Sequence, residues 1–345
     1  MAFVLWNEAS DNNKLNSNTN QKLRVAIIFG GRSGEHEISL RSAASVKKAL
    51  HPDKYEIHEY FIDKSGKWSP APFTPEPGMN PDIDVVIPML HGTFGEDGSI
   101  QGLLELADLP YVGAGVLASA VSMDKSVTKR LCKEAGLPVV EHVVLTRGHF
   151  NPHSVTLPFP FPVFVKPANL GSSVGISKAK NARELHNALE TASQYDRKIV
   201  VERGVQGREF ECAVLGGDPP SATMPCEIIP SEEFYTYDDK YLLDKARIEL
   251  PAKLSGPQVE EVKRLSIGCF EAVGCEGMAR VDFLMDAASG EFFVNEINTI
   301  PGFTSISMFP KMWEYSGVEY SSLLDRLIQL ALERAEARRQ IQYSR

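Results

Sequence analysis

Four polar side chains near the carboxyl end of the chain have types and spacings that could hold a metal ion beside a phosphate: Arg280, Asp282, Glu296 and Asn298. Hard cations such as Mg²⁺ take oxygen ligands in octahedral geometry, and they usually keep waters and substrate phosphates among those ligands. Two carboxylates and one amide oxygen can supply the protein part of such a set. The alternative is a solvated face with an arginine–carboxylate ion pair, and the spacing alone does not decide between them.

A hairpin would bring these four side chains together. Residues 278–285 and 291–298 have the composition of strands, and residues 286–290 between them are turn-forming. Side chains two positions apart share one face of a strand. A register with Met285 opposite Glu291 therefore places all four side chains on one face, whereas a slip by one residue would separate them.

Two loops that contain glycine and serine are candidates for binding phosphate. Residues 300–305 leave the second strand of the hairpin, and residues 167–175 follow a predicted strand over residues 163–166 that ends at Lys166. A lysine ammonium, hydroxyls and closely approaching backbone N–H groups are the usual partners of a phosphate. The 167–175 loop is not a Walker A sequence, and a plain hairpin turn explains its composition equally well.

Composition and charge limit the class of protein. The chain has 345 residues, of which 43% are hydrophobic and 23% are charged, so it can form two or three globular domains. The net charge of −9 argues against a generic surface for nucleic acid or for an anionic membrane.

Cysteine usage and hydropathy indicate a cytoplasmic protein. The five cysteines form no CxxC pair and no cysteine–histidine spacing of a zinc site, as expected for reduced structural thiols. No apolar run approaches the roughly 18 residues of a membrane-spanning helix. Residues 1–21 lack a basic start and an apolar core, so we expect a flexible leader and not a signal peptide.

The first predicted domain begins as a doubly wound α/β unit. Residues 23–29 form an apolar strand, residues 30–34 a glycine-rich turn and residues 38–50 a helix. Glu35 lies where that helix begins, at the carboxyl end of the strand, where ligands bind in such folds. The alternative for Glu35 is an acidic residue that the helix dipole favours at its N-terminus.

A further strand of this domain ends in a loop with three glycines. Residues 85–90 are apolar and lead into residues 91–98, which contain His91. This loop would form a second wall of the same cleft, although a single histidine in such a place is more often a structural hydrogen-bonding residue. Residues 113–118 fit the G-x-G-x-x-A dinucleotide pattern, but that pattern belongs to the first strand–helix unit, so we interpret them as a packing turn.

Later elements include a linker between two carboxylates and a long loop. A strand over residues 199–202 ends at Glu202, and the next strand begins after Glu209. Two carboxylates that bracket a linker can bind a base and a ribose, but this spacing is not distinctive by itself. Residues 231–243 form an aromatic, charged loop of a length that is uncommon unless it has a function. Helices are expected at residues 125–135, 257–273 and 321–339.

Taken together, these motifs resemble the ATP-grasp superfamily and, within it, the family of D-alanine–D-alanine ligases. The resemblance covers residues 23–334 and rests on residues 30–39, 91–98, 171–175 and 295–299 with Pro301-Gly302. It implies an α/β (α+β) protein in which a doubly wound parallel-sheet domain precedes two α+β domains that clasp ATP. The implied segments are a leader (1–21), a Rossmann-like domain (22–122), a central ATP-grasp subdomain (123–206) and a C-terminal catalytic subdomain (207–345).

The resemblance implies that ATP lies between the antiparallel sheets of the second and third domains. The residues implied to contact its phosphates, ribose and adenine are Lys125, Lys166, Ser172, Ser173, Glu202, Arg203, Val205, Glu209, Phe234 and Lys240. It also implies two Mg²⁺ ions, with Mn²⁺ as a substitute and K⁺ as a further candidate. The implied metal ligands are Asp282, Glu296 and Asn298.

A third set of residues is implied to bind or act on the amino acids: Glu35, His91, Ser172, Lys240, Tyr241, Arg280, Gly302 and Ser307. Glu35 would meet the ammonium group of the first D-alanine, and the two hydroxyl residues Ser172 and Tyr241 would hydrogen-bond beside it when the site closes. Arg280 and the Gly302 amide would stabilise an oxyanion. Lys240 and Ser307 would hold the carboxylate of the second substrate.

The implied activity is ATP-dependent joining of two D-alanines through an acyl phosphate, for peptidoglycan precursor synthesis. A ligase for D-lactate or D-serine is the alternative within the family, and the Lys240-Tyr241 pair favours D-alanine. A non-catalytic nucleotide-binding module is the alternative of another class, and it predicts gaps in the metal or oxyanion sets that the sequence does not have. We expect small-molecule partners, no nucleic acid, no membrane and a homodimer.

Overall fold

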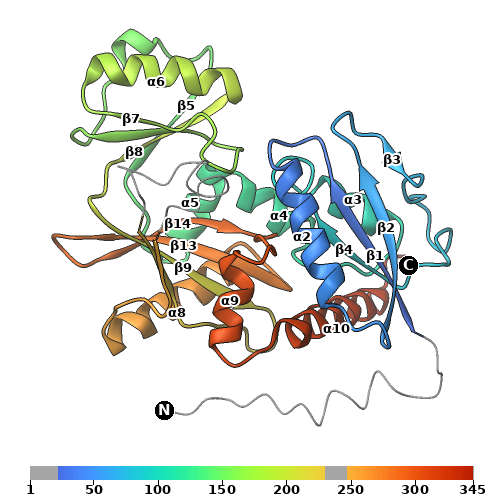
Figure 1. Ribbon diagram of the computed structural model, residues 1–345. Helices are drawn as coiled ribbons and strands as arrows, with labels where there is room; N and C mark the ends of the chain where they lie inside the picture. The colour runs from blue at the N-terminus through green and yellow to red at the C-terminus, as the bar shows by residue number, and fades with distance from the viewer. Residues whose placement is uncertain (1–21, 230–246, 345) are drawn as a thin grey trace.

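Three β-sheets with flanking helices make up the part of the chain that the structure describes (Figure 1). The structure is a computed structural model, and it describes residues 22–229 and 247–344. The predicted contacts Phe234, Lys240 and Tyr241 lie outside these residues. No helix in the described part of the chain is both long enough and apolar enough to cross a membrane.

The first sheet has the order β3-β2-β1-β4, and its three long strands are parallel. These are β1 (Leu23–Gly30), β2 (Tyr55–Ile62) and β4 (Val85–Met89), while the short β3 (Trp68–Ser69) pairs antiparallel at the edge. The central strands β1 and β4 are buried because helices cover the sheet. The chain passes from β1 to β2 and β3 on one side and then returns to β4 on the other side of β1, so the strand order reverses there. The carboxyl end of β1 is therefore a topological switch point, where ligands bind in such folds.

Helices from both ends of the chain accompany this sheet. They are α2 (His36–Ala49), α3 (Ser99–Leu106) and, from the far end of the chain, α10 (Tyr320–Arg339). Helix α4 (Val116–Met123) contacts α3 on one side and the third sheet on the other. Leu323 and Leu327 of α10 belong to the same apolar core as Val25 of β1 and Val46 of α2. The Arg334 guanidinium also donates a 2.7 Å hydrogen bond to the carbonyl oxygen of Tyr111. The C-terminal helix therefore ties the end of the chain to its first sheet, as Figure 1 shows.

The second sheet is antiparallel and has the order β5-β8-β6-β7. Its strands are β5 (His142–Thr146), β6 (Val163–Pro167), β7 (Ser177–Ala179) and β8 (Lys198–Arg203). Helix α6 (Ala182–Tyr195) begins with an Asn181 cap and packs its apolar stripe on the sheet, which gives this lobe a core of its own. A short 3-10 helix, η1 (Pro152–Ser154), precedes β6.

The third sheet has the order β12-β11-β9-β13-β14, with β10 (Ser221–Ala222) paired to β9. The ladder strands are β9 (Gly207–Leu215), β11 (Cys226–Ile229), β12 (Arg247–Glu249), β13 (Met278–Asp286) and β14 (Phe292–Asn298). Helices α5 (Lys125–Glu134) and α8 (Gly256–Ala272) contact β14, and α9 (Met308–Tyr315) contacts β9. Alternating burial along β13 leaves one face for the core and the other for polar side chains.

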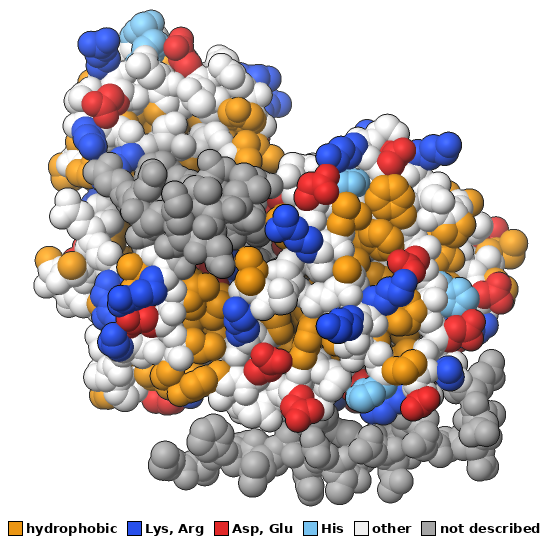
Figure 2. Space-filling model, in the orientation of Figure 1, with side chains coloured by type: hydrophobic (Ala, Val, Ile, Leu, Met, Phe, Trp, Pro, Cys, Tyr) orange, Lys and Arg blue, Asp and Glu red, His pale blue; other side chains and the backbone are white. Residues whose placement is uncertain are grey.

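The predicted α/β class and element types are confirmed, with element ends shifted by a few residues. Residues 113–118 form a turn, as expected: Gly113 has φ of +98°, and Gly115 precedes α4. The predicted domain boundaries at residues 122 and 206 stay predictions. On the face in Figure 2 basic and acidic side chains are interspersed.

The predicted hairpin register is wrong. Met285 pairs with Phe292 and not with Glu291, and Arg280 pairs with Asn298 and not with Glu296. The ladder shifts between Asp282 and Phe283, where β14 has one extra residue. Because of this β-bulge, all four polar side chains still share one face of the hairpin, as the sequence analysis expected.

Candidate active site

Two neighbouring cavities contain most of the predicted site residues in the described part of the chain. The larger, of about 380 Å³, lies between the second and third sheets and is lined by β6, β8, β9, β11 and β14. The smaller, of about 190 Å³, lies where the loops after β1, β4 and β14 meet the amino end of β13. Gly171, Ser172 and Glu296 line both cavities, so the two share a wall. Figure 2 shows the recess between the lobe that carries α6 and the lobe that carries α2.

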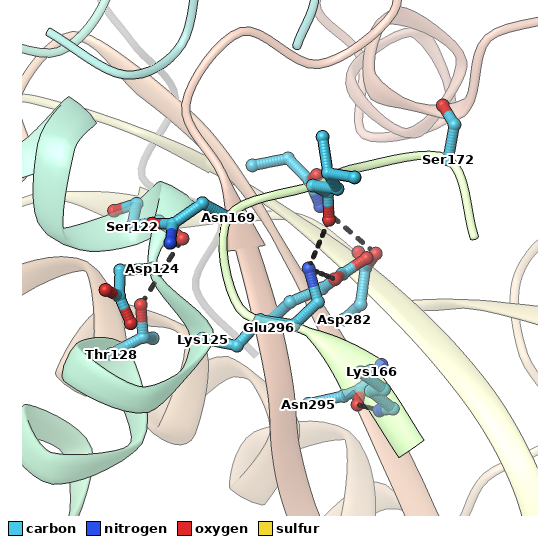
Figure 3. Close-up of polar contacts among 12 residues, drawn as sticks. Ser122, Asp124, Lys125, Thr128, Lys166, Asn169, Ser172, Asp282, Asn295 and Glu296 are labelled. Atoms are coloured by element: carbon cyan, nitrogen blue, oxygen red, sulfur yellow. Dashed lines mark hydrogen bonds and ion pairs between the residues drawn. The ribbon is translucent and has the colours of Figure 1, made fainter. Parts of the chain in front are cut away.

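Two lysines from different elements reach the larger cavity. The Lys125 ammonium, at the start of α5, donates a 2.7 Å hydrogen bond to the carbonyl oxygen of Leu170 and lies 3.4 Å from the Glu296 carboxylate. The Lys166 ammonium, near the end of β6, donates to Glu202 at 2.8 Å and to the Asn295 side-chain oxygen at 3.2 Å. Both lysines are largely buried, and Figure 3 shows Lys125 beside Glu296 and Lys166 beside Asn295.

The Glu202 carboxylate belongs to the wall of this cavity and is almost inaccessible to solvent. It lies 2.8 Å from the Lys166 ammonium and 3.1 Å from that of Lys129. Burial alone would raise the pKa of Glu202, but the two lysines lower it to about 2. Burial likewise acts to lower the pKa of Lys166, and the Glu202 carboxylate outweighs this and raises it. Glu202 and Lys166 are therefore both ionised.

The polar face of the hairpin carries the candidate metal ligands. Asp282 pairs directly with Glu296 across the strands, and Arg280 pairs with Asn298. The Arg280 guanidinium donates two 2.7 Å hydrogen bonds to Asp282, and the Asn298 side-chain amide donates one to Asp282 at 3.1 Å. The bidentate pair holds the guanidinium and the carboxylate in one plane.

Arg280 has a second acidic neighbour. The Glu211 carboxylate, on the adjacent strand β9, lies 3.3 Å from the Arg280 guanidinium and is buried. Both residues line the smaller cavity. Arg280 thus stands between two carboxylates, which fixes its direction toward the cavity before any ligand is bound.

The oxygen atoms of this face could bind a divalent metal ion. Among the described residues no three histidine, cysteine, aspartate or glutamate side chains cluster as a metal site. The hairpin face offers Asp282 and Glu296 with the Asn298 amide oxygen, and this small all-oxygen set suits Mg²⁺, which usually keeps waters and substrate phosphates as its other ligands. The residues present therefore fit Mg²⁺.

Glu35 and Ser172 meet across the smaller cavity, although 137 residues separate them. The Ser172 hydroxyl donates a hydrogen bond to the Glu35 carboxylate. Ser172 and Ser173 both have positive φ, of 52° and 60°, which is uncommon for residues other than glycine and typical of functional loops. Gly92 has φ of +73°, and a Cβ there would lie 2.4 Å from a Glu35 oxygen, so a side chain at residue 92 would displace the carboxylate.

His91 has protein partners on both ring nitrogens. Nδ1 lies 3.0 Å from the carbonyl oxygen of Ile300, and Nε2 lies 2.9 Å from the Ser42 hydroxyl. Burial lowers the pKa of His91, so the ring is neutral: Nδ1–H donates to the carbonyl, and Nε2 accepts from the hydroxyl. His91 therefore joins the loops after β4 and β14 that form the cavity wall.

Glu96 makes a parallel connection between these two loops. Its carboxylate accepts hydrogen bonds from the backbone N–H of Gly92 at 2.7 Å and of Ile300 at 3.2 Å. Burial and the neighbouring Glu35 carboxylate raise the pKa of Glu96 to about 8. Glu96 lines the smaller cavity and positions the loop that continues to Gly302.

The loop after β14 is folded tightly around Gly302. A Cβ at Gly302 would lie only 2.7 Å from the Ser307 hydroxyl oxygen, so this position has no room for a side chain. The Ser307 hydroxyl accepts from the Thr304 N–H at 3.0 Å and lies 2.8 Å from the Thr304 hydroxyl. Gly302 and Ser307 both line the smaller cavity.

Comparisons with known proteins identify the family. The family model described as D-ala D-ala ligase C-terminus matches residues 131–329, and that described as D-ala D-ala ligase N-terminus matches residues 24–81 and 74–114. A D-alanine–D-alanine ligase from Solibacter usitatus is 60% identical over 324 residues, which are 94% of this chain and 100% of that relative. The chain belongs to the D-alanine–D-alanine ligase family.

Solved structures of ligases agree with this membership. The D-alanine–D-alanine ligase from Coxiella burnetii has a TM-score of 0.82 at 38% identity, covering 92% of this chain and 96% of that chain. The VanG D-Ala:D-Ser ligase from Enterococcus faecalis has a TM-score of 0.80 at 34% identity, covering 90% of this chain and 100% of that chain. The ATP-grasp fold predicted from the sequence is therefore confirmed.

The predicted residues separate into two groups around the shared wall. Those implied for the nucleotide that line the larger cavity are Lys125, Lys166, Ser172, Ser173, Glu202, Arg203, Val205 and Glu209. Those implied for the amino acids that line the smaller cavity are Glu35, His91, Ser172, Arg280, Gly302 and Ser307. Two of these residues already have protein partners for the groups that were expected to contact a ligand. The Glu202 carboxylate pairs with two lysines, and both ring nitrogens of His91 contact protein groups.

Four residues of this ligase-family site were given no role by the sequence analysis, although two of them lie in its motifs: Glu96, Lys129, Glu211 and Asn295. Lys129 follows Lys125 by four positions, and this spacing places both on one face of a helix, so it was a usable signal. Glu211 follows Glu209 by two positions on a strand and shares its face. Glu96 hydrogen-bonds to a loop from a distant part of the chain, and Asn295 lies at a β-bulge. Residue spacing does not indicate either feature.

Proposed function

We propose that this protein joins two molecules of D-alanine to D-alanyl-D-alanine and converts ATP to ADP and phosphate. The observation that carries the proposal is the shared wall at Glu296, Gly171 and Ser172, where a cavity with two lysines meets a cavity with a carboxylate and a guanidinium. A phosphoryl donor in the first cavity and a carboxylate acceptor in the second would meet at this wall. The family membership and the relatives' names support the same reaction.

The chemistry divides between the two cavities. A free carboxylate is a poor electrophile, so an oxygen of the first D-alanine attacks the γ-phosphorus of ATP, the bond to the β-phosphate oxygen breaks, and an acyl phosphate and ADP form. Phosphoryl transfer depends on positioning and charge neutralisation. Lys125 and Lys166 would neutralise the phosphates. Arg203, Val205 and Glu209 line the part of the cavity assigned to the base and ribose.

Peptide-bond formation follows in the smaller cavity. The amine of the second D-alanine attacks the acyl carbon, the carbon–nitrogen bond forms, and inorganic phosphate leaves with the carboxylate oxygen that had attacked. The Arg280 guanidinium and the Gly302 N–H would donate to the tetrahedral oxyanion. Glu35 would bind the ammonium of the first D-alanine, and Ser307 would bind the carboxylate of the second.

We assign the hairpin face to divalent metal. Asp282, Glu296 and Asn298 would hold Mg²⁺, which when bound supplies positive charge to the phosphates during transfer. Two ions, substitution by Mn²⁺ and a site for K⁺ belong to this proposal. The domain boundaries at 122 and 206, a homodimer and a cytoplasmic location are proposed with it.

Ligation to D-serine or D-lactate is the second candidate function. It is favoured by the 34% identity to a protein named as a D-Ala:D-Ser ligase. Lys240 and Tyr241, which are implied to select the second substrate, lie outside the described residues. An assay with each candidate substrate distinguishes the two functions.

Phosphate release tests these functions. D-Alanine, D-lactate, D-serine and L-alanine are supplied singly and in pairs with ATP and Mg²⁺, and the products are weighed by mass spectrometry. We expect release with D-alanine alone and a D-alanyl-D-alanine product. Release only with a pair that includes D-lactate or D-serine would support the second function. Binding of ATP without release in any mixture would leave a nucleotide-binding module.

A further inference from the structure

A third lysine lies behind the wall of the nucleotide cavity. Lys129 is on α5, one turn after Lys125, and its side chain is only 1% exposed. Its ammonium lies 3.1 Å from one oxygen of the Glu202 carboxylate, whose other oxygen accepts from Lys166 at 2.8 Å. Lys166 and Glu202 line the cavity, and Lys129 does not.

A packing role does not explain a lysine at this position. Removing an ammonium ion from water is energetically costly, and an ion pair only partly offsets that cost. Leucine or methionine would fill comparable space without it. The next lysine on the same helix, Lys133, is exposed, so buried positive charge is not a general property of α5.

The charge balance explains what Lys129 contributes. Lys166 and Glu202 alone would form a neutral pair, and a neutral pair offers little attraction to phosphate. Lys129 adds a second positive charge to the same carboxylate, so the three groups together carry one net positive charge at the cavity wall. The other hydrogen-bond acceptor of Lys166 is the Asn295 side-chain oxygen, at 3.2 Å, and it carries no charge.

We propose that Lys129 is a positioning residue for nucleotide phosphates: it occupies the Glu202 carboxylate and so leaves the Lys166 ammonium with net positive charge toward the larger cavity. This inference rests on the proposed function, because it takes that cavity to bind the nucleotide. Lys129 touches no ligand and acts through Glu202 and Lys166.

The inference predicts opposite effects for two substitutions. Lys129→Met leaves Lys166 and Glu202 as a neutral pair, so ADP should bind about ten-fold more weakly. Glu202→Gln leaves two lysines without a carboxylate, so ADP should bind at least as tightly as to the wild-type protein. The double variant Lys129→Met/Glu202→Gln restores one net positive charge, and its affinity should return to within about three-fold of wild type.

Isothermal titration of the full-length protein with ADP and, separately, with adenosine tests this. Adenosine has no phosphate, so its affinity should be the same in the wild type and in Lys129→Met, whose changed residue does not line the cavity. Lys133→Met is the matched control on the same helix and should bind both ligands as the wild type does. Circular dichroism checks that each variant is folded.

Three results would overturn the inference. One is equal affinity of Lys129→Met and wild type for ADP. Another is parallel loss of ADP and adenosine binding, which indicates a structural role. The third is weakened ADP binding in Glu202→Gln. If Lys129→Met does not fold, the Glu202→Gln variant alone tests the inference. Wild-type protein that binds neither ligand would instead overturn the proposed nucleotide cavity, and the inference with it.

Discussion

Asp282 and Glu296 lie directly opposite each other on antiparallel strands only because β14 contains one extra residue. If the pairing of residues 283–285 continued without a bulge, Asp282 would lie opposite Asn295 and Glu296 would point to the other face of the sheet. The bulge at Asn295 shifts the ladder by one residue, so the two carboxylates share a face, and the displaced Asn295 accepts a hydrogen bond from Lys166. The bulge at Asn295 therefore positions both the candidate metal ligands and a hydrogen-bond acceptor for Lys166.

Removal of either carboxylate should weaken metal binding. In Asp282→Asn and Glu296→Gln one anionic ligand is lost, so half-maximal phosphate release should need about 10–100-fold more Mg²⁺ or should not be reached. Titration of activity with Mg²⁺ at saturating ATP measures this. Glu291→Gln, an exposed acid on the same hairpin, is the control and should leave the titration unchanged. An unaltered Mg²⁺ requirement in both variants would exclude this face as the metal site.

Arg280→Lys should reduce the rate of ligation and leave nucleotide binding intact. Lysine keeps the charge but cannot donate two hydrogen bonds to Asp282, so the oxyanion donor loses its fixed direction. Loss of one such donor typically lowers kcat about 100-fold or more. Steady-state kinetics and ADP titration measure the two effects, with the exposed Arg264→Lys on α8 as control. A normal kcat would refute the role of Arg280.

Glu35→Gln should weaken the binding of D-alanine and not that of ATP. The Glu35 carboxylate lies in the smaller cavity and accepts from Ser172, so its loss removes a charged partner for an ammonium group. We expect KM for D-alanine to rise about ten-fold or more, with KM for ATP changed little. Glu37→Gln, an exposed acid paired with Lys64, is the control. An equal rise in both KM values would contradict the assignment.

Glu202 should make the stability of the fold depend on acid pH. Its pKa is about 2 in the folded protein, against an ordinary value of 4.5, so its contribution is complete above pH 4.5 and is lost as pH falls toward 2. A shift of that size corresponds to about 3 kcal/mol in the free energy of unfolding. Glu202→Gln should therefore be less stable than wild type at pH 7, and the difference should narrow between pH 4.5 and 2.

Denaturant unfolding at a series of pH values tests this prediction. Glu260→Gln removes an exposed carboxylate on α8 and is the matched control. Its unfolding free energy should follow that of the wild type throughout. A stability difference between wild type and Glu202→Gln that does not change below pH 4.5 would mean that Glu202 is not an ionised member of the lysine cluster.

The sequence was sufficient for the fold class, and most of the candidate residues that it indicated in the described part of the chain line one of the two cavities. Apolar strands and glycine-rich turns depend on local chemistry, so β1, β6 and β13 could be predicted within a few residues. Their polar end residues could be assigned because ligands bind at strand ends in such folds. The motif order then gave the family, which the comparisons confirmed.

The remaining features depend on contacts between distant segments. The hairpin register was predicted wrongly because a bulge at Asn295 has no signature in residue types. Lys129 was overlooked because a lysine on a helix normally faces water, and its burial depends on Glu202, 73 positions later in the chain. His91 likewise depends on distant segments, because its partner Ser42 lies on α2 and its partner Ile300 lies in the loop after β14.

The most direct test of the account follows an oxygen atom from the substrate to the phosphate. D-Alanine labelled with ¹⁸O in both carboxylate oxygens is incubated with the wild-type protein, ATP and Mg²⁺, and the inorganic phosphate is analysed by mass spectrometry. An acyl phosphate requires that one ¹⁸O per ligation appears in the phosphate and that the new peptide bond retains the other. Phosphate without ¹⁸O, alongside D-alanyl-D-alanine, would contradict the proposed reaction between the two cavities.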